Sequence, residues 1–226
     1  LKQTLGSNGK DVIDEVKSKL LELKKDLPPG LDYQISYDVA SFLDASIQQV
    51  LHTLRDAFIL VAIVVFLFLG DWRSTLIPII AVPVSLIGAF FVIQLFGLSI
   101  NLITLFALVL AIGIVVDNAI VVVEAVHVKM EEEHLNPYKA STEVLGEIGG
   151  AIIAITLVMV SVFIPISFMT GPVGVFYRQF SITMAGSIVI SAVVALTLTP
   201  VLCAILLKNN HGKPKKKSPI DKFIDW

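Results

Sequence analysis

Two long stretches of this chain are almost free of charged residues, and they constrain the fold more than any other feature. Residues 57–123 carry only the charges of Asp71, Arg73 and Asp117, and residues 148–207 carry only that of Arg178. A helix needs roughly 20 mainly apolar residues to cross a hydrocarbon core about 30 Å thick, so the two stretches have room for about five or six membrane spans.

The composition agrees with a membrane protein and excludes several other classes. The 226 residues are 55% hydrophobic and 16% charged, whereas soluble domains average about 25% charged residues. A net charge of -2 argues against nucleic acid or another phosphate-rich partner. The single cysteine, Cys203, cannot form a disulfide within the chain.

The pattern predicts an all-α polytopic membrane bundle with five transmembrane helices in a domain over residues 41–207. Glycine-containing breaks at 70–73, 97–99 and 171–174 separate the apolar runs. Residues 208–226 are expected to form a cytoplasmic basic tail and the start of an amphipathic helix. The expected helices span about 42–69, 75–96, 101–130, 148–169 and 180–207.

Residues 1–40 have the pattern of a small α/β piece outside the membrane. A helix is expected to begin after Asn8 and to stop at Pro28-Pro29-Gly30. Apolar and polar residues then alternate from Leu31 to Tyr37, which is typical of a half-buried strand. With a second strand at residues 1–5 this would be a β-α-β unit, too short to close its own core. Because it also starts at Leu1 rather than methionine, we expect the chain to be part of a longer protein.

Lysine and arginine in the connecting segments predict the orientation. Arg73, the loop at 124–147 and the tail after Lys208 hold nearly all of these residues, whereas the opposite side has only Arg178. Short loops rich in Lys and Arg stay on the cytoplasmic side. The basic side is therefore expected to be cytoplasmic, with the N-terminal piece in the periplasm of a Gram-negative cell.

Asp117 is the candidate functional residue. About 24 Å of helix separates it from Asn101 and about 10 Å from Glu124, which places the carboxyl inside the hydrocarbon. An ionised Asp there costs at least about 2.5–3.5 kcal/mol, and such acids usually mark ion pathways. An acid beside a cation that can move away can bind and release a proton. We therefore predict a proton relay at Asp117 and Asn118; the alternative is that Asp117 is an interhelical hydrogen-bonding group.

Asn118 and the other polar residues of the spans are less specific. The Asn118 amide cannot titrate, but it can donate to Asp117 or accept from a cation, and packing and functional roles stay open. No Lys or Arg is expected inside the spans as a counter-charge. The sequence shows no phosphate-binding loop, metal-ligand cluster or activated nucleophile, so neither an enzyme nor a cofactor is expected. Small residues at helical spacing are interpreted as packing faces: Ala107, Ala111, Ser187, Ser191 and Ala195.

Several longer motifs resemble one family of transporters. The segment from Gly97 through Asp117-Asn118 to Glu124 closely resembles the fourth transmembrane helix of resistance–nodulation–cell-division (RND) efflux pumps of the hydrophobe/amphiphile branch. The resemblance extends over 76–83, 177–183 and 198–203, and over the N-terminal Pro28-Pro29-Gly30 motif, which is similar to the end of a porter subdomain. It implies that the five spans are helices two to six of twelve.

The resemblance also implies a function. Family members are homotrimeric inner-membrane drug/proton antiporters that export hydrophobic or amphiphilic compounds, together with a periplasmic adaptor protein and an outer-membrane channel. Their fourth helix commonly carries two adjacent acids that pair with a lysine on the tenth helix. Asp117 falls on the first acid and Asn118 on the second, so this sequence departs from the two-acid pattern. The alternatives are a protein-translocation helper of the same superfamily and a membrane scaffold that transports nothing.

Overall fold

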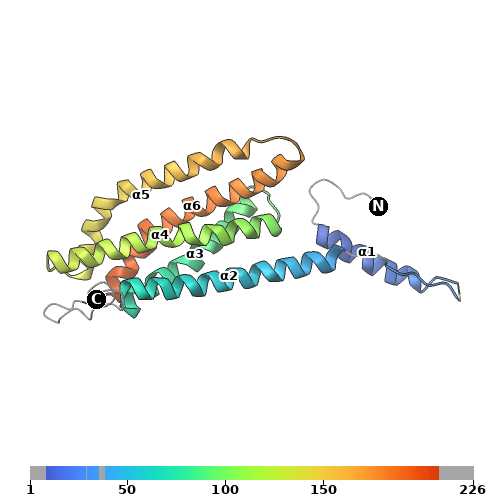
Figure 1. The fold of residues 1–226 in the computed structure, drawn as a ribbon, viewed down its shortest axis with the longest axis horizontal. Helices are drawn as coiled ribbons and strands as arrows, with labels where there is room; N and C mark the ends of the chain where they lie inside the picture. The colour runs from blue at the N-terminus through green and yellow to red at the C-terminus, as the bar shows by residue number, and fades with distance from the viewer. Residues whose placement is uncertain (1–8, 29, 36–38, 209–226) are drawn as a thin grey trace, which may run out of the picture.

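The computed structural model describes residues 9–28, 30–35 and 39–208, and this part of the chain folds into α helices. Helices α2 to α6 run alternately between the two ends of one bundle, and α1 projects beyond it (Figure 1). The helices are α1 (Gly9–Lys24), α2 (Val39–Leu69), α3 (Trp72–Leu95), α4 (Leu102–Glu132), α5 (Pro137–Ser167) and α6 (Gly171–Leu206).

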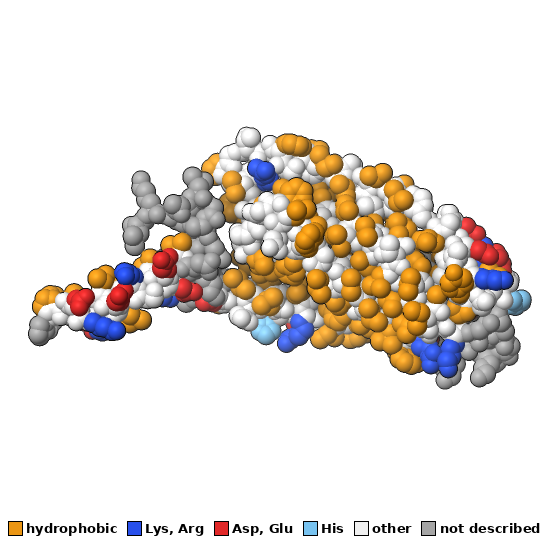
Figure 2. Space-filling view, turned by 180° about the vertical axis from the view of Figure 1, so that it is seen from behind, with side chains coloured by type: hydrophobic (Ala, Val, Ile, Leu, Met, Phe, Trp, Pro, Cys, Tyr) orange, Lys and Arg blue, Asp and Glu red, His pale blue; other side chains and the backbone are white. Residues whose placement is uncertain are grey.

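Helices α2 to α6 are long and apolar enough to cross a membrane, which confirms the expected all-helical bundle with five candidate spans. Figure 2 shows hydrophobic side chains over the visible face of the bundle, with charges at its ends and along α1. We call the end that carries Arg73, Lys129 and Lys208 the basic end, and the end that carries the α3–α4 turn the opposite end.

Helix α4 lies at the centre and contacts α2, α3, α5 and α6. Most of its buried side chains are small or β-branched, so the neighbouring helices approach closely. Membrane helices gain little from the hydrophobic effect against lipid, and such close packing is a main source of their association. The buried apolar residues of α4 include Ala107, Ala111, Val115, Ala119, Val122, Val123 and Val126.

Side-chain caps fix the starts of the helices at the places that the sequence marks. Asn101 caps α4 by accepting from the backbone N–H groups of Ile103 and Thr104, and the Thr104 hydroxyl accepts from the Asn101 N–H. This reciprocal capping box satisfies donors that would otherwise stay unpaired. Asn136 caps α5 ahead of Pro137 with a single hydrogen bond, which its side chain accepts from the Lys139 N–H.

Helices α4 and α5 are joined at the basic end by a cluster of ion pairs. The Lys129 ammonium lies 2.7 Å from Glu133, 3.7 Å from Glu143 and 2.5 Å from Glu147. The Lys129 side chain is only 15% exposed, because the start of α5 folds back over it. The charged segment at 124–147, which was interpreted as a loop from its sequence, is mostly helical, with a short turn at 133–136.

The last helix begins earlier than expected. The break at 171–174 was predicted to separate two helices, with the second starting near residue 180, but α6 starts at Gly171 itself. Gly171 adopts a φ of 87°, which favours glycine, and Pro172 occupies the first turn, where it needs no hydrogen-bond donor. The Gly-Pro pair therefore starts the new helix within the turn.

The expected N-terminal α/β piece is only partly found. Helix α1 is present, and the Lys24 ammonium lies 2.9 Å from the Asp32 carboxylate, which lowers the Asp32 pKa. Residues 31–35, expected to begin a strand, form none, and the described residues contain no strand; Tyr37 and residues 1–5 lie outside them. A strand exists only when another backbone completes its hydrogen bonds, and alternation alone does not supply that partner.

Candidate proton-transfer site

Asp117 lies on a face of α4 that the other helices of the chain leave open. Phe106, Leu110 and Val121 share this open face and are 55%, 47% and 44% exposed. Gly113, one turn before Asp117, has no atom within 4 Å of the position where a side chain would begin. The four helices packed around α4 therefore leave uncovered the face of α4 that carries Asp117.

The Asp117 carboxylate has no hydrogen-bond or ion-pair partner among the residues that the structure describes, although it is the acid expected to need one. Its neighbours on the open face are apolar, so neither Phe106 nor Val121 offers a donor. A carboxylate at this depth is stable only when a cation or water reaches it. The open face is therefore the side from which the rest of the site has to come.

Asn118 points the other way, into the seam between α4 and α6. It is 8% exposed, and its amide Nδ2 donates to the Ser191 hydroxyl at 3.1 Å. Ser191 in turn donates to the backbone carbonyl of Val115, also at 3.1 Å. The two adjacent polar residues of α4 therefore do not act on each other; one faces the open side and the other ties α4 to α6.

Sequence reasoning assigned Ser191 to packing alone, and the structure adds a hydrogen bond. Ser191 is 2% exposed, and Ser187 and Ala195, one turn away on either side, are equally buried. The signal in the sequence was the hydroxyl within a row of small residues spaced by four, because such rows often carry interhelical hydrogen bonds. The sequence alone did not show which residue of α4 lies opposite Ser191.

The described residues contain no group of three His, Cys, Asp or Glu side chains placed to hold a metal ion. At the basic end, His127 Nε2 lies 2.6 Å from the Ser74 hydroxyl, and Ser74 donates to the Asp71 carboxylate at 3.1 Å. The His127 ring therefore joins α4 to the first turn of α3.

Comparison with known proteins identifies the family. The AcrB/AcrD/AcrF family model matches residues 1–226. The multidrug export protein AcrF of Escherichia coli (strain K12) is 47% identical over 208 residues, which are 92% of this chain and 20% of AcrF. The toluene efflux pump membrane transporter TtgE of Pseudomonas putida is 42% identical over 100% of this chain and 21% of TtgE. The chain belongs to the AcrB/AcrD/AcrF family.

The chain spans about one fifth of the length of these AcrB/AcrD/AcrF relatives. The family is one of membrane transporters, and the multidrug resistance protein MdtF of Escherichia coli (strain K12) is a further relative, 44% identical over 92% of this chain and 20% of MdtF. Membership confirms the resemblance drawn from the motifs around Asp117. It leaves the role of each residue in this AcrB/AcrD/AcrF chain to be argued from its geometry.

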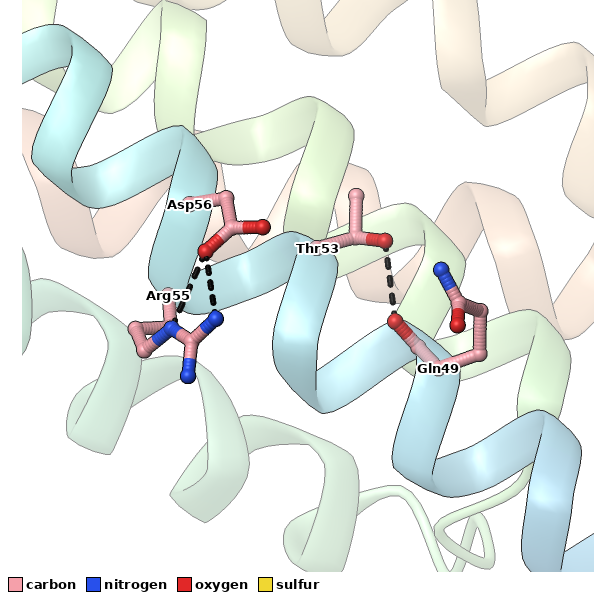
Figure 3. Close-up of polar contacts among 4 residues, drawn as sticks. All are labelled: Gln49, Thr53, Arg55 and Asp56. Atoms are coloured by element: carbon pink, nitrogen blue, oxygen red, sulfur yellow. Dashed lines mark hydrogen bonds and ion pairs between the residues drawn. The ribbon is translucent and has the colours of Figure 1, made fainter.

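One sequence expectation about this family member was wrong. The spans were expected to lack Lys and Arg, but Arg55 lies within the candidate span Asp44–Leu69 of α2. Figure 3 shows its guanidinium against the neighbouring Asp56, with Nε and Nη2 donating to Oδ1 at 2.9 and 2.8 Å. The pair has no net charge, but both side chains are strongly polar, and Arg55 stands in the sequence within the expected helix 42–69.

Proposed function

We propose that this chain is part of a proton-driven efflux transporter that exports hydrophobic or amphiphilic compounds, with Asp117 as its proton-carrying group. The single observation behind the proposal is the carboxylate of Asp117, held within an apolar helix on the open face of α4 without a partner in the described chain. Intramembrane acids of this kind occur mainly where protons or ions pass. The names of the relatives, multidrug export and toluene efflux, support the substrate class.

We place the protein in the bacterial inner membrane with the basic end in the cytoplasm. Arg73, Lys129 and Lys208 lie at that end, and the positive-inside rule assigns it to the cytoplasm. The residues before α2 then lie in the periplasm. Assembly as a homotrimer with a periplasmic adaptor protein and an outer-membrane channel completes the proposal, and it rests on family membership.

In this mechanism Asp117 and Asn118 have separate tasks. Asp117 takes a proton from the periplasmic side and releases it towards the basic end, and each proton gains about 2.3 kcal/mol per 100 mV of membrane potential. A cation from the part of the protein outside this chain would pair with Asp117 when its carboxylate is ionised. The cation would move away when Asp117 is protonated. Asn118 cannot titrate, so it holds α4 against α6 through Ser191 while that exchange takes place.

The test is Asp117→Asn in the full-length protein. It removes the titratable group and keeps the size and polarity of the side chain, so we expect drug resistance to fall to the level of a strain without the pump. Val121→Asn is the matched control, because Val121 lies one turn away on the same open face and is 44% exposed. Wild-type resistance in the Asp117→Asn strain, at equal expression and assembly, would eliminate Asp117 as the proton carrier.

A further inference from the structure

The outward face of α2 changes from polar to apolar part-way along the helix. Gln49, Thr53 and Asp56 follow one another at helical spacing on the side of α2 that faces away from the bundle, and all are exposed. The same face continues as Leu60 and Ile63, which are 62% and 52% exposed. We call the first part, Gln49 to Asp56 with Arg55 beside it, the polar stripe.

Two independent measures place the inner end of the polar stripe inside the membrane. Counting a hydrocarbon thickness of about 30 Å back from Leu69 reaches residue 50, so Asp56 lies about 9 Å below the boundary. Packing gives the same level, because Ile47 and Val50 share a core cluster with Ile93 and Leu98 at the opposite end of α3 and the turn after it. The polar stripe therefore descends into the depth range of apolar α3 residues.

The chemistry of the polar stripe does not suit lipid. Arg55 uses its Nε and one Nη2 hydrogen on Asp56 Oδ1, and a guanidinium has five N–H donors in all. The two side chains are 62% and 64% exposed, so the remaining donors and the second carboxylate oxygen point outward. Acyl chains offer these groups no hydrogen bond. Thr53 is satisfied within its own helix, by the Gln49 carbonyl at 2.9 Å (Figure 3), and needs no protein partner.

From this arrangement we infer that the polar stripe lines a water-filled cleft, which enters the membrane from the opposite end of the bundle and ends at Arg55 and Asp56. Water satisfies the outward-facing donors and acceptors without requiring a matching set of buried charges from another helix. Figure 2 shows basic and histidine side chains interrupting the hydrophobic surface near the end of the bundle that faces α1, which agrees with a wetted strip there.

The cleft would shorten the path of a proton to Asp117. Val61 and Val65 of α2 share a core cluster with Val115 and Val116, which directly precede Asp117. The same cluster includes Leu54 and Leu69, so it places Asp117 beside the middle of α2, deeper in the span than Asp56. Water would carry protons over the outer part of the span, and the proton relay would begin below Asp56. This consequence rests on the proposed function, whereas the cleft itself does not.

Cysteine accessibility tests the cleft in the full-length protein in intact cells, in a background without other reactive cysteines. The probe is a membrane-impermeant sulfonated methanethiosulfonate added from outside. Thr53→Cys should react within about 10-fold of the rate of Ser99→Cys in the exposed turn, and Ile63→Cys at least about 100-fold more slowly, because apolar surroundings keep a thiol protonated and unreactive. A rate for Thr53→Cys as low as that of Ile63→Cys overturns the inference.

Two further variants keep the test decisive. Gln49→Cys, one turn nearer the outside, replaces Thr53→Cys if the latter does not assemble. Adding Arg55→Leu with Asp56→Leu to Thr53→Cys should slow its modification, because the wetted end of the stripe becomes apolar; an unchanged rate counts against the ion pair as the floor of the cleft. Labelling is scored on assembled protein whether or not it exports drugs, so a failure of the Asp117 proposal leaves this result readable.

Discussion

At the scale of single residues, Ser191 offers the sharpest test of how α4 is held. Ser191→Ala would leave the buried Asn118 amide without its acceptor. An interhelical hydrogen bond in a membrane contributes roughly 0.6–2 kcal/mol, so the variant should unfold more easily by about that amount. Denaturation in mixed micelles with increasing sodium dodecyl sulfate measures the difference. Ser161→Ala is the control, because Ser161 is exposed and bonds only to the carbonyl of Val158 in its own helix.

If Ser191→Ala and Ser161→Ala unfold at the same detergent fraction, the Asn118–Ser191 bond does not stabilise the bundle.

The two residues of the candidate site differ in what the sequence revealed. Asp117 was readable because one acid stands in a long apolar run, and the cost of burying it is a local property. The partner of Asn118 was not readable, because Ser191 lies on another helix and only the packing of α4 against α6 brings it close.

At the scale of helices, the start of α6 depends on a glycine that has no room for a side chain. A Cβ at Gly174 would collide with the backbone carbonyl oxygen of Met169, in the turn that precedes the helix. Gly174→Ala should therefore destabilise the protein by about 1–3 kcal/mol through overpacking. Thermal unfolding of the purified protein measures the loss as a lower Tm.

Gly146→Ala is the matched control for Gly174→Ala. Gly146 lies in the interior of α5 with nothing within 4 Å of its missing side chain, so alanine there should stabilise the helix by about 0.5–1 kcal/mol. Equal effects at the two positions would contradict the collision at Met169.

The existence and type of the membrane helices followed from hydropathy. The start of α6, in contrast, depended on the conformation of Gly171 and Pro172, which composition does not reveal. The strand expected from Leu31 failed for a related reason, since its partner is not a local feature.

At the scale of the whole molecule, the alternation of five helices puts the two ends of the described chain on opposite sides of the membrane. Helix α2 begins at the opposite end of the bundle and α6 finishes at the basic end (Figure 1). The open face of α4 runs between these ends. The direction of the proposed proton movement through Asp117 therefore depends on which end faces the cytoplasm.

Impermeant thiol labelling of intact cells decides the orientation. Ser99→Cys, in the exposed turn between α3 and α4, should be modified in intact cells, because the positive-inside rule puts a turn without Lys or Arg on the outside. Glu132→Cys, exposed at the basic end of α4, should be modified only after the membrane is permeabilised. The reverse pattern would place the basic end outside. Asp117, which lies nearer the basic end of α4, would then lie close to the periplasm, and a proton entering from there would bypass the polar stripe on α2 altogether.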